Sequence, residues 1–454
     1  MQLAQSDVVE FARASGDHNP LHADESFARC TSFGRTIVHG ALVTVAALAA
    51  LPPERLRLMV GLTVSFIQPV FPGAPFTVER EPDDRLTISA QGSRLVKITP
   101  HFEEGGTPPA QPFGQSEHLD QHPLDEGRLR RLAERLGAAA VPMPLLSGMA
   151  WVSWLVGMRN PGRDALLAGF TVRTARDAAA VPWARVDAAD ERTGALTLVG
   201  GNPAVTAIVR AFRRQPVPEP TPASLAEFLS PSDSLTGRHV MVVGASRGWG
   251  AAMAAALASQ QATVFALYAH SQDRVARLAE RFPGVIPLRA DATDQDALLA
   301  VRDRIRQVCP TLDGLVLSAA PPLRSIAPHP DAADDQLAFV QTSLNLAVRP
   351  LLALDALLTA QSWTLVASST AVAAPRRNWA HYVAAKSGIE GYVRAWAGQR
   401  DVRTVLVRAP KLLTDMMNSP LGRIGAMPAE QAAAAAVQAV LKPASSLVTV
   451  LDDL

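Results

Sequence analysis

Two copies of one sequence pattern, 108 residues apart, constrain the fold of the N-terminal half most strongly. In the first copy an apolar, helix-like run opens at residues 39–42, and a Gly-x-Thr-Val segment begins 21 residues after Gly40. In the second copy a similar run opens at residues 147–150, and the matching segment begins 21 residues after Gly148. A long helix followed by alternating, strand-like segments predicts two α+β units, each with its sheet wrapped around the helix. The segments lie at 76–80, 85–91 and 94–103, and again at 183–189, 195–201 and 204–212.

From about Thr236 the chain follows a different rhythm, in which short apolar strands alternate with helix-length segments. This alternation predicts βαβ units, and hence an α/β fold with a Rossmann-type, doubly wound parallel sheet. The strands are expected at 239–244, 262–268, 312–319, 363–369, 402–410 and 445–454.

A proline-rich segment divides the two halves. Residues 213–224 contain four prolines and no apolar periodicity, which is typical of an extended spacer. A weaker break lies at 103–115. We therefore expect one repeat over 1–105, a second over 116–214, a linker over 215–235 and the α/β domain over 236–454.

Composition excludes several classes of protein. The chain has 454 residues and a formal net charge of +1, so neither nucleic acid nor an anionic membrane is an expected partner. Cys30 and Cys309 are the only cysteines, too few for a disulfide framework or a zinc cluster, which fits a reducing, cytoplasmic compartment. Charged residues such as Asp7 and Arg13 interrupt any signal-peptide core, and no uninterrupted apolar stretch reaches membrane-spanning length.

A first candidate site lies at residues 15–22, Ser-Gly-Asp-His-Asn-Pro-Leu-His. Asp17 and His22 stand five residues apart, with Pro20 stiffening the chain between them. Dehydration of a 3-hydroxyacyl thioester, or its reverse, needs a base for the proton beside the carbonyl and an acid for the departing hydroxyl. A carboxylate and an imidazole can share these roles. Gly40, at an expected helix start, offers backbone N–H groups and a close approach to the developing enolate oxygen.

Residues 11–42 and 62–79 resemble the MaoC-like family, the (R)-specific enoyl-CoA hydratases and related dehydratases of the hotdog fold. The resemblance covers roughly residues 5–100. It implies that Asp17 and His22 are the catalytic dyad and that Gly40 is the backbone donor of the oxyanion hole.

The second copy lacks this pair. At the positions that correspond to Asp17 and His22 stand Asp125 and Arg130, inside or beside a charged helical run. We therefore expect a double hotdog with one working site, in which the non-catalytic copy replaces a second subunit. Trp151 and Trp154 are expected to be core residues.

A second candidate site begins at residues 242–250, Val-Val-Gly-Ala-Ser-Arg-Gly-Trp-Gly, between a predicted strand and a predicted helix. Three glycines there permit a tight turn and close approach of the backbone to a pyrophosphate. The candidate cofactor-binding residues of this loop are Gly244, Ser246, Arg247, Gly248 and Gly250.

Further along the chain, Tyr382 and Lys386 lie on one face of a predicted helix, Ser369 ends a predicted strand, and Asn345 lies in a helical segment. Hydride addition to a ketone builds negative charge on its oxygen, so a proton donor must stand beside it. A phenol neighbouring an ammonium suits this role, since the ammonium lowers the pKa of the phenol. Ser369 can hydrogen-bond the substrate carbonyl.

This constellation resembles the short-chain dehydrogenase/reductase family over about Thr236–Leu454. The resemblance implies a catalytic triad of Ser369, Tyr382 and Lys386, with Asn345 as the fourth position. It also implies that Lys386 holds the nicotinamide ribose, that Thr414 contacts the carboxamide and that Asp291 contacts the adenine. The sequence departs from the family at Ser318 and Ala319, where asparagines are usual, and at Pro410-Lys411.

The cofactor indicated by the sequence is NADPH. Sheets that bind NAD usually place an acid at the end of the second strand, and residues 262–271 contain none. Arg247 and His270 are instead positioned to meet a 2′-phosphate.

The two resemblances together predict a bifunctional enzyme that reduces a 3-ketoacyl thioester with NADPH and then dehydrates the product to a trans-2-enoyl thioester, in polyketide or fatty-acid-type biosynthesis. The carrier is an acyl carrier protein or coenzyme A, no metal is expected, and a homodimer through the reductase domain is possible. Two alternatives remain. One is hydration followed by oxidation. The other is a dehydratase attached to a non-catalytic nucleotide-binding scaffold.

Overall fold

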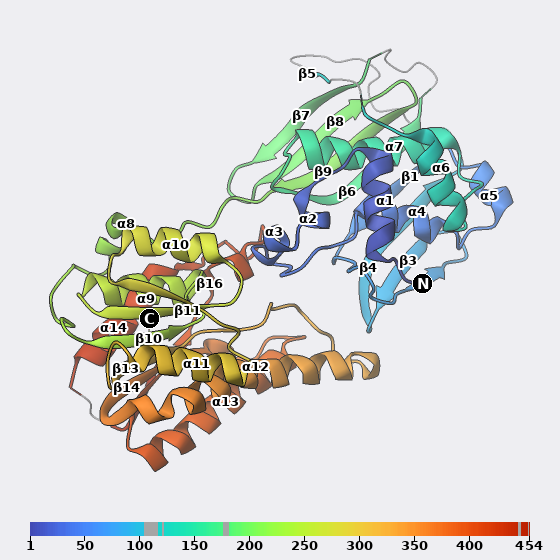
Figure 1. Ribbon diagram of the computed structural model, residues 1–454. Helices are drawn as coiled ribbons and strands as arrows, with labels where there is room; N and C mark the ends of the chain where they lie inside the picture. The colour runs from blue at the N-terminus through green and yellow to red at the C-terminus, as the bar shows by residue number, and fades with distance from the viewer. Residues whose placement is uncertain (104–116, 120–121, 176–180, 444–445, 453) are drawn as a thin grey trace. The chain divides into compact units, whose positions relative to one another are not determined.

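The computed structural model describes residues 1–103, 117–119, 122–175, 181–443, 446–452 and 454 (Figure 1). The chain forms two compact units. Unit 1 contains Met1–Gln215 and Ser419–Leu421, and unit 2 contains Pro216–Asn418 and Gly422–Leu454.

Unit 1 is built on one antiparallel sheet in the order β2-β3-β4-β1-β6-β9-β8-β7-β5. β1 and β6 pair at its centre, where Thr63 lies opposite Thr171 and their hydroxyl oxygens are 2.9 Å apart. These two residues are equivalent in the 108-residue repeat, so a local two-fold axis passes between them. The double-hotdog class is therefore confirmed. The strands are β1 (Gly61–Phe66), β2 (Thr77–Arg80), β3 (Leu86–Ala90), β4 (Ser93–His101), β5 (Glu117–His118), β6 (Ala165–Thr174), β7 (Trp183–Asp190), β8 (Ala195–Gly201) and β9 (Val205–Arg213).

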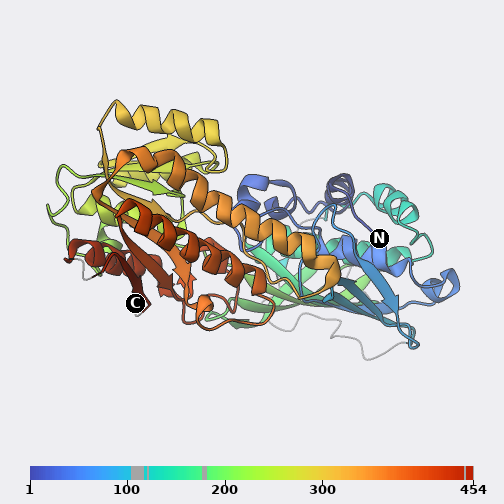
Figure 2. The same ribbon diagram turned by 90° about the horizontal axis from the view of Figure 1, so that it is seen from below.

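Two apolar helices, α4 (Gly40–Leu48) and α7 (Met143–Trp154), share one core with this sheet and contact each other. The helices of unit 1 lie on one face of the sheet (Figure 2). α7 begins at Met143, earlier than the predicted start at 147, because prolines at its first turn favour a helix N-terminus there. Trp151 and Trp154 are buried in this core, as predicted. The remaining helices are α1 (Gln5–Ser15), α2 (Pro20–Ala23), α3 (Glu25–Arg29), α5 (Pro53–Arg57), α6 (Glu126–Arg135) and the π-helical turn η1 (Leu155–Arg159).

Unit 2 contains a seven-stranded parallel sheet in the order β12-β11-β10-β13-β14-β15-β18, which confirms the Rossmann-type class. On one face of the sheet, α8, α9 and α14 pack against the strands in one apolar cluster. On the other face, α11, α12 and α13 pack against them in a second apolar cluster (Figures 1 and 2). The strands are β10 (His239–Val243), β11 (Thr263–Tyr268), β12 (Val285–Arg289), β13 (Leu312–Leu317), β14 (Leu358–Ser369), β15 (Arg403–Ala409) and β18 (Val448–Leu451), with a separate pair β16 (Leu412–Leu413) and β17 (Met427–Pro428). The helices are α8 (Pro222–Ala226), α9 (Gly248–Ser259), α10 (Gln272–Arg281), α11 (Gln295–Arg306), α12 (Ala333–Leu354), α13 (Ala380–Arg400) and α14 (Ala429–Leu441), with 3₁₀ turns at Pro330–Ala332, Asp355–Leu357, Thr370–Val372 and Asp415–Met417.

The segment expected as a linker, 215–235, is folded in its second part. Thr221 and Ser224 form a capping box that starts α8. Leu225, Leu229 and Leu235 are buried in the core of unit 2, so this stretch packs as part of that unit.

One helical stretch among the described residues, Pro330–Leu357, is long and apolar enough to cross a membrane. Of its most apolar 18-residue window, 33% is buried. A single helix of this kind is weak evidence for a membrane span, because the core helices of globular domains pass the same test of length and composition. Its α12 part packs against α11 and α13.

Candidate active sites

The structure brings Asp17 and His22 together in unit 1. One carboxylate oxygen of Asp17 and one ring nitrogen each of His22 and His39 all lie within 4.8 Å of one another. Asp17 follows α1, and α2 then carries His22 back toward it because Asn19 caps that helix and Pro20 starts it. The side chain of Asp17 is 2% exposed, whereas His22 is partly exposed. His22 is thus the member of the pair nearer to solvent.

Hydrogen bonds fix the roles of the two imidazoles. Nδ1 of His22 donates to the carbonyl of Ile37 at 2.8 Å, which leaves its Nε2 available as a base in the neutral ring. Nε2 of His39 donates to the carbonyl of Asp17 at 3.1 Å, and the rings of His39 and His22 stack with centroids 3.7 Å apart. His39 therefore supports both members of the pair, a contact that the sequence analysis missed although His39 precedes Gly40.

Burial dominates the electrostatics of this cluster. It raises the pKa of Asp17, although the charge of His22 and a hydrogen bond from Ser153 act in the opposite direction. It lowers the pKa of His22 and holds that of His39 well below its usual range. The two pKa values of Asp17 and His22 are thus moved toward each other, which suits an acid and a base that exchange roles.

The same three residues are the one His/Asp group within the described part of the chain with spacing that could suit a metal ion. Imidazole nitrogens bind metals in the ring plane at about 2 Å. Stacked rings such as those of His22 and His39 do not direct their lone pairs at one point, so the arrangement fits acid–base chemistry better.

Gly40 is the first residue of α4, and His39 is its N-cap. The N–H groups of a first helical turn have no partner within the helix and carry the positive end of its dipole. A Cβ atom on Gly40 would stand 2.6 Å from the ring of Phe66, so any larger residue would require that ring to move. In the second repeat Gly148 lies inside α7 instead of at its start, and no helix terminus is available at the equivalent position.

The second repeat nevertheless reaches the first site. The hydroxyl of Ser153 donates to Oδ2 of Asp17 at 2.6 Å. Nδ2 of Asn19 donates to the carbonyls of Gly157, Gly162 and Arg163 at 3.0–3.3 Å. Sequence spacing offers no signal for these contacts, because they join residues at least 136 positions apart.

In unit 2 the glycine loop connects β10 to α9. Gly244 and Gly248 have φ values of 87° and 56°, which favour glycine. A Cβ atom on Gly250 would stand 2.1 Å from the carbonyl oxygen of Gly244. The loop leads directly into the N-terminus of α9, which begins at Gly248, and the backbone N–H groups there suit a phosphate. Ser318 supports the turn by donating to the carbonyl of Val243 at 2.7 Å.

The structure also brings together Ser369, Tyr382 and Lys386. Ser369 ends β14, and the other two lie on α13. Tyr382 and Ser369 share a hydrogen bond that lowers the pKa of the phenol, but burial outweighs it and the pKa is raised. The expected lowering by Lys386 is absent because its ammonium lies 5.9 Å from the ring centroid of Tyr382 and donates to the carbonyl of Ala367 at 2.8 Å.

Burial lowers the pKa of Lys386 to about 8, and the charge of Glu390 opposes this. Glu390 lies one turn further along α13 and is itself held by Arg408 at 2.8 and 2.9 Å and by Ser368 at 2.5 Å. The sequence analysis missed Glu390, although its spacing of four residues from Lys386 was a usable signal. Asn345 is half-buried on α12, which packs against α13.

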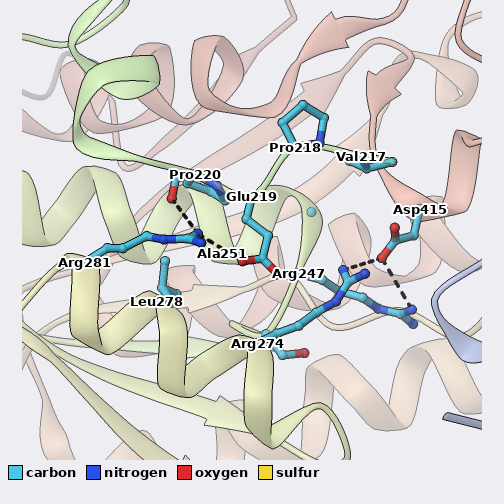
Figure 3. Close-up of a pocket in the computed structure, with 12 residues that line it drawn as sticks. Val217, Pro218, Glu219, Pro220, Arg247, Ala251, Arg274, Leu278, Arg281 and Asp415 are labelled. Atoms are coloured by element: carbon cyan, nitrogen blue, oxygen red, sulfur yellow. Dashed lines mark hydrogen bonds and ion pairs between the residues drawn. The ribbon is translucent and has the colours of Figure 1, made fainter. Parts of the chain in front are cut away.

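A pocket lies beside the glycine loop and is lined by Ser246, Arg247 and Gly248 together with residues of α10 and of segment 217–220 (Figure 3). Arg274 of α10 and Arg247 both point at Oδ2 of Asp415, at 2.7 and 3.9 Å. Two guanidinium groups thus converge on one anion, and Arg274 was not identified from the sequence. Asp291 accepts hydrogen bonds from Thr293 within its own turn.

His270 follows β11. The pKa of Asp291 is lowered mainly by its hydrogen bonds from Thr293, with a smaller contribution from His270. Thr414 lies against the glycine loop, since a Cβ atom on Gly248 would stand 3.1 Å from its methyl group. These positions place both residues near the carboxyl ends of the strands, where open α/β sheets bind their ligands.

Two family models match the chain. The MaoC like domain matches residues 1–94, and the short chain dehydrogenase model matches residues 238–421. The chain is 40% identical over 109 residues to an (R)-specific enoyl-CoA hydratase of Aeromonas caviae, which covers 23% of this chain and 78% of that protein. It is also 40% identical over 73 residues to a 3-hydroxybutyryl-CoA dehydratase of Methylorubrum extorquens, which covers 15% of this chain and 46% of that protein.

Among solved structures, the chain is similar to a short chain dehydrogenase from Burkholderia cenocepacia solved in complex with NADP, with 24% identity and a TM-score of 0.44 over 48% of this chain and 98% of that one. A dehydrogenase/reductase from Sinorhizobium meliloti gives 21% identity and a TM-score of 0.44 over 49% and 96% of the two chains. The chain therefore belongs to the MaoC-like dehydratase family through its N-terminal region, and its C-terminal unit is a short-chain dehydrogenase domain.

Proposed function

We propose that this protein is a bifunctional ketoreductase-dehydratase of acyl thioesters. Unit 2 reduces a 3-ketoacyl thioester to the 3-hydroxyacyl thioester, and unit 1 removes water to give the trans-2-enoyl thioester. The observation that carries the proposal is that one chain brings Asp17 beside His22 and Tyr382 beside Lys386, two partly buried pairs suited to handle protons. Reduction makes the hydroxyl group that dehydration removes.

In unit 1 the neutral imidazole of His22 takes the proton from C2 of the thioester through Nε2. The carboxyl group of Asp17, whose pKa is raised by burial, is suited to protonate the departing hydroxyl, so that water leaves and the C2–C3 double bond forms. The thioester oxygen carries the developing negative charge and receives hydrogen bonds from the N-terminus of α4 at Gly40. In the hydration direction the same groups exchange roles.

In unit 2 the ketone oxygen accepts hydrogen bonds from Ser369 and Tyr382, and Tyr382 gives it the proton as hydride reaches the carbon. A bound nicotinamide supplies that hydride. Lys386 restores charge balance beside the phenolate, and Asn345 on α12 is suited to hold a water for reprotonation. The glycine loop fits a dinucleotide, because α9 starts at Gly248 within this loop and its first turn offers unpaired N–H groups to a pyrophosphate.

NADPH is the proposed cofactor, because residues 262–271, which include β11 and the three residues after it, contain no carboxylate for a ribose 2′-hydroxyl. Arg247 and Arg274 provide two guanidinium groups beside the loop, and both now face Asp415 (Figure 3). A 2′-phosphate would replace that carboxylate as their anion.

Coenzyme A is the proposed carrier over an acyl carrier protein, since both curated relatives carry CoA substrates in their names. In unit 1, Arg163 and Arg214 lie over the ring of Phe27, at 5.1 and 5.5 Å. Arg214 also contributes to the lowered pKa of His22. The exposed Arg163 suits the anionic end of a CoA thioester, whereas Arg214 is buried and lies 3.9 Å from Asp164.

A homodimer through unit 2 is part of the proposal. α12 exposes Leu337 and Leu352, and α13 exposes Tyr392, which are 67%, 51% and 38% accessible. Large apolar side chains on neighbouring long helices favour burial against a second copy. Sedimentation of the full chain tests this, and a monomer at micromolar concentration contradicts it.

Mass spectrometry of the products tests the reaction sequence. Wild-type protein with NADPH and acetoacetyl-CoA should give crotonyl-CoA. Tyr382→Phe should stop reduction yet still interconvert crotonyl-CoA and 3-hydroxybutyryl-CoA, and His22→Ala should stop at the hydroxy product. Wild-type protein that consumes no NADPH with any 3-ketoacyl thioester would exclude the proposal.

Hydration followed by oxidation is the second candidate, because one curated relative is named a hydratase. It predicts that NAD is rapidly reduced when the protein is given crotonyl-CoA, because hydration gives 3-hydroxybutyryl-CoA, which is then oxidised to acetoacetyl-CoA. The ratio of kcat/KM for NADPH to that for NADH separates the two directions.

A further inference from the structure

The catalytic carboxylate of unit 1 depends on a hydroxyl from the other repeat. Ser153 lies on α7 of the second repeat, is 4% exposed, and donates to Oδ2 of Asp17 at 2.6 Å. Asp17 is 2% exposed. A buried carboxylate needs hydrogen-bond donors to replace water, and Ser153 is the donor that reaches Oδ2, while the N–H of Asn19 reaches Oδ1 at 3.2 Å.

The backbone after Ser153 is shaped around the same carboxylate. α7 widens there into the π-helical turn η1, a distortion often found at functional sites. A Cβ atom on Gly157 would stand 2.2 Å from Oδ1 of Asp17, so the turn approaches closer than a side chain allows. The amide of Asn19 binds the carbonyl of Gly157 at 3.0 Å and locks the loop of Asp17 to this turn.

We infer that Ser153 is a positioning residue of the dehydratase site, which holds the carboxylate of Asp17 toward the substrate and stabilises its ionised form. The second repeat, although it lacks an acid–imidazole pair, then completes the active site of the first. This inference rests on the proposed dehydratase function of unit 1.

The electrostatic surroundings give the sign of the effect. The groups that face Asp17 are His22, His39 and His18, together with Ser153. Desolvation raises the pKa of Asp17 and the hydrogen bond from Ser153 lowers it. Loss of the hydroxyl should therefore raise this pKa further.

Ser147 provides a matched control. It lies on the same helix, is 5% exposed, and its hydroxyl has no hydrogen-bond partner among the described residues.

Ser153→Ala should reduce kcat for hydration of crotonyl-CoA about tenfold or more, the effect of one lost hydrogen bond to a charged group, with KM nearly unchanged. The acid limb of its pH profile should move to higher pH. Ser153→Thr, which keeps a hydroxyl, should restore the wild-type profile.

Ser147→Ala should retain both the wild-type rate and the wild-type profile. Ser153→Ala with the kinetics and pH profile of Ser147→Ala would overturn the inference. If the alanine variant does not fold, Ser153→Cys replaces it, because a thiol fills the space but donates weakly. If wild-type protein hydrates no enoyl thioester, the proposed function fails separately, and the pKa of Asp17 measured by NMR in wild type and Ser153→Ala still decides. An unchanged pKa contradicts the inference.

Discussion

Burial acts in the same way on the two proton-handling pairs. It raises the pKa of Asp17 and of Tyr382, and it lowers the pKa of His22 and of Lys386, since each group loses hydration of its charged form. In the Asp17–His22 pair these shifts move the two pKa values toward each other, and groups matched in this way transfer protons readily near neutral pH. In the Tyr382–Lys386 pair, whose ordinary pKa values are nearly equal, the same shifts move the two values apart.

Lys386 should control the alkaline limb of the reductase. Its ammonium, present below a pKa of about 8, is the form proposed to act, and Glu390 stabilises that form. Glu390→Gln should lower this pKa, so kcat/KM for reduction should begin to fall at a lower pH than in wild type. Glu280→Gln, at an exposed carboxylate of α10, is the control and should leave the profile in place. A shift to higher pH with Glu390→Gln would contradict this assignment.

Arg274 should contribute to cofactor choice. Arg274→Ala should raise KM for NADPH about tenfold, the effect of one charged hydrogen bond, and change KM for NADH little. Arg304→Ala removes an exposed arginine of α11 and should change neither constant. Equal losses with both cofactors in Arg274→Ala would show that this residue does not meet the 2′-phosphate.

At the scale of the elements, two helix ends and one distorted turn shape the sites. α4 starts at Gly40 and α9 starts at Gly248, so each site receives the unpaired N–H groups of a first turn. The π-helical turn η1 brings the backbone of Gly157 against Asp17.

Gly157 should therefore tolerate no side chain. Gly157→Ala must displace the carboxylate of Asp17, and we expect a loss of about 100-fold or more in hydratase kcat and of about 1–3 kcal/mol in the free energy of unfolding. Gly127→Ala, at an exposed position of α6, meets no atom closer than 3.4 Å and should instead stabilise unit 1 by up to about 1 kcal/mol. Chemical denaturation and steady-state kinetics measure both effects. Wild-type activity in Gly157→Ala would refute the close approach.

The sequence predicted those elements whose pattern is local. The matched Gly-x-Thr-Val segments predicted the repeat that places Thr63 opposite Thr171, and strand alternation predicted most of both sheets. β12 was missed because it is a five-residue edge strand that contains Pro287, which edge strands tolerate.

Contacts between distant segments could not be predicted in the same way. Ser153 and Arg274 reach their partners across 136 and 141 residues, and no spacing rule joins them. The expected influence of Lys386 on Tyr382 was wrong, because spacing placed both on one face of α13 but did not show that the ammonium binds the carbonyl of Ala367.

For the whole molecule, the proposal joins a MaoC-like dehydratase and a short-chain dehydrogenase in one chain, so that the product of unit 2 is the substrate of unit 1. A tether raises the effective concentration of each site for the product of the other. Joining the two units in one chain speeds the overall reaction only if both units act on the same acyl chain.

Isotope tracing tests that claim most directly. Full-length protein should be given acetoacetyl-CoA with NADPH carrying deuterium on either face of nicotinamide C4, in separate runs, and the products examined by mass spectrometry. One label should appear at C3 of crotonyl-CoA, because reduction delivers hydride to C3 and dehydration removes only a C2 proton and the C3 hydroxyl. The account would be contradicted by crotonyl-CoA that carries no label in either run, or by labelled 3-hydroxybutyryl-CoA that is never dehydrated.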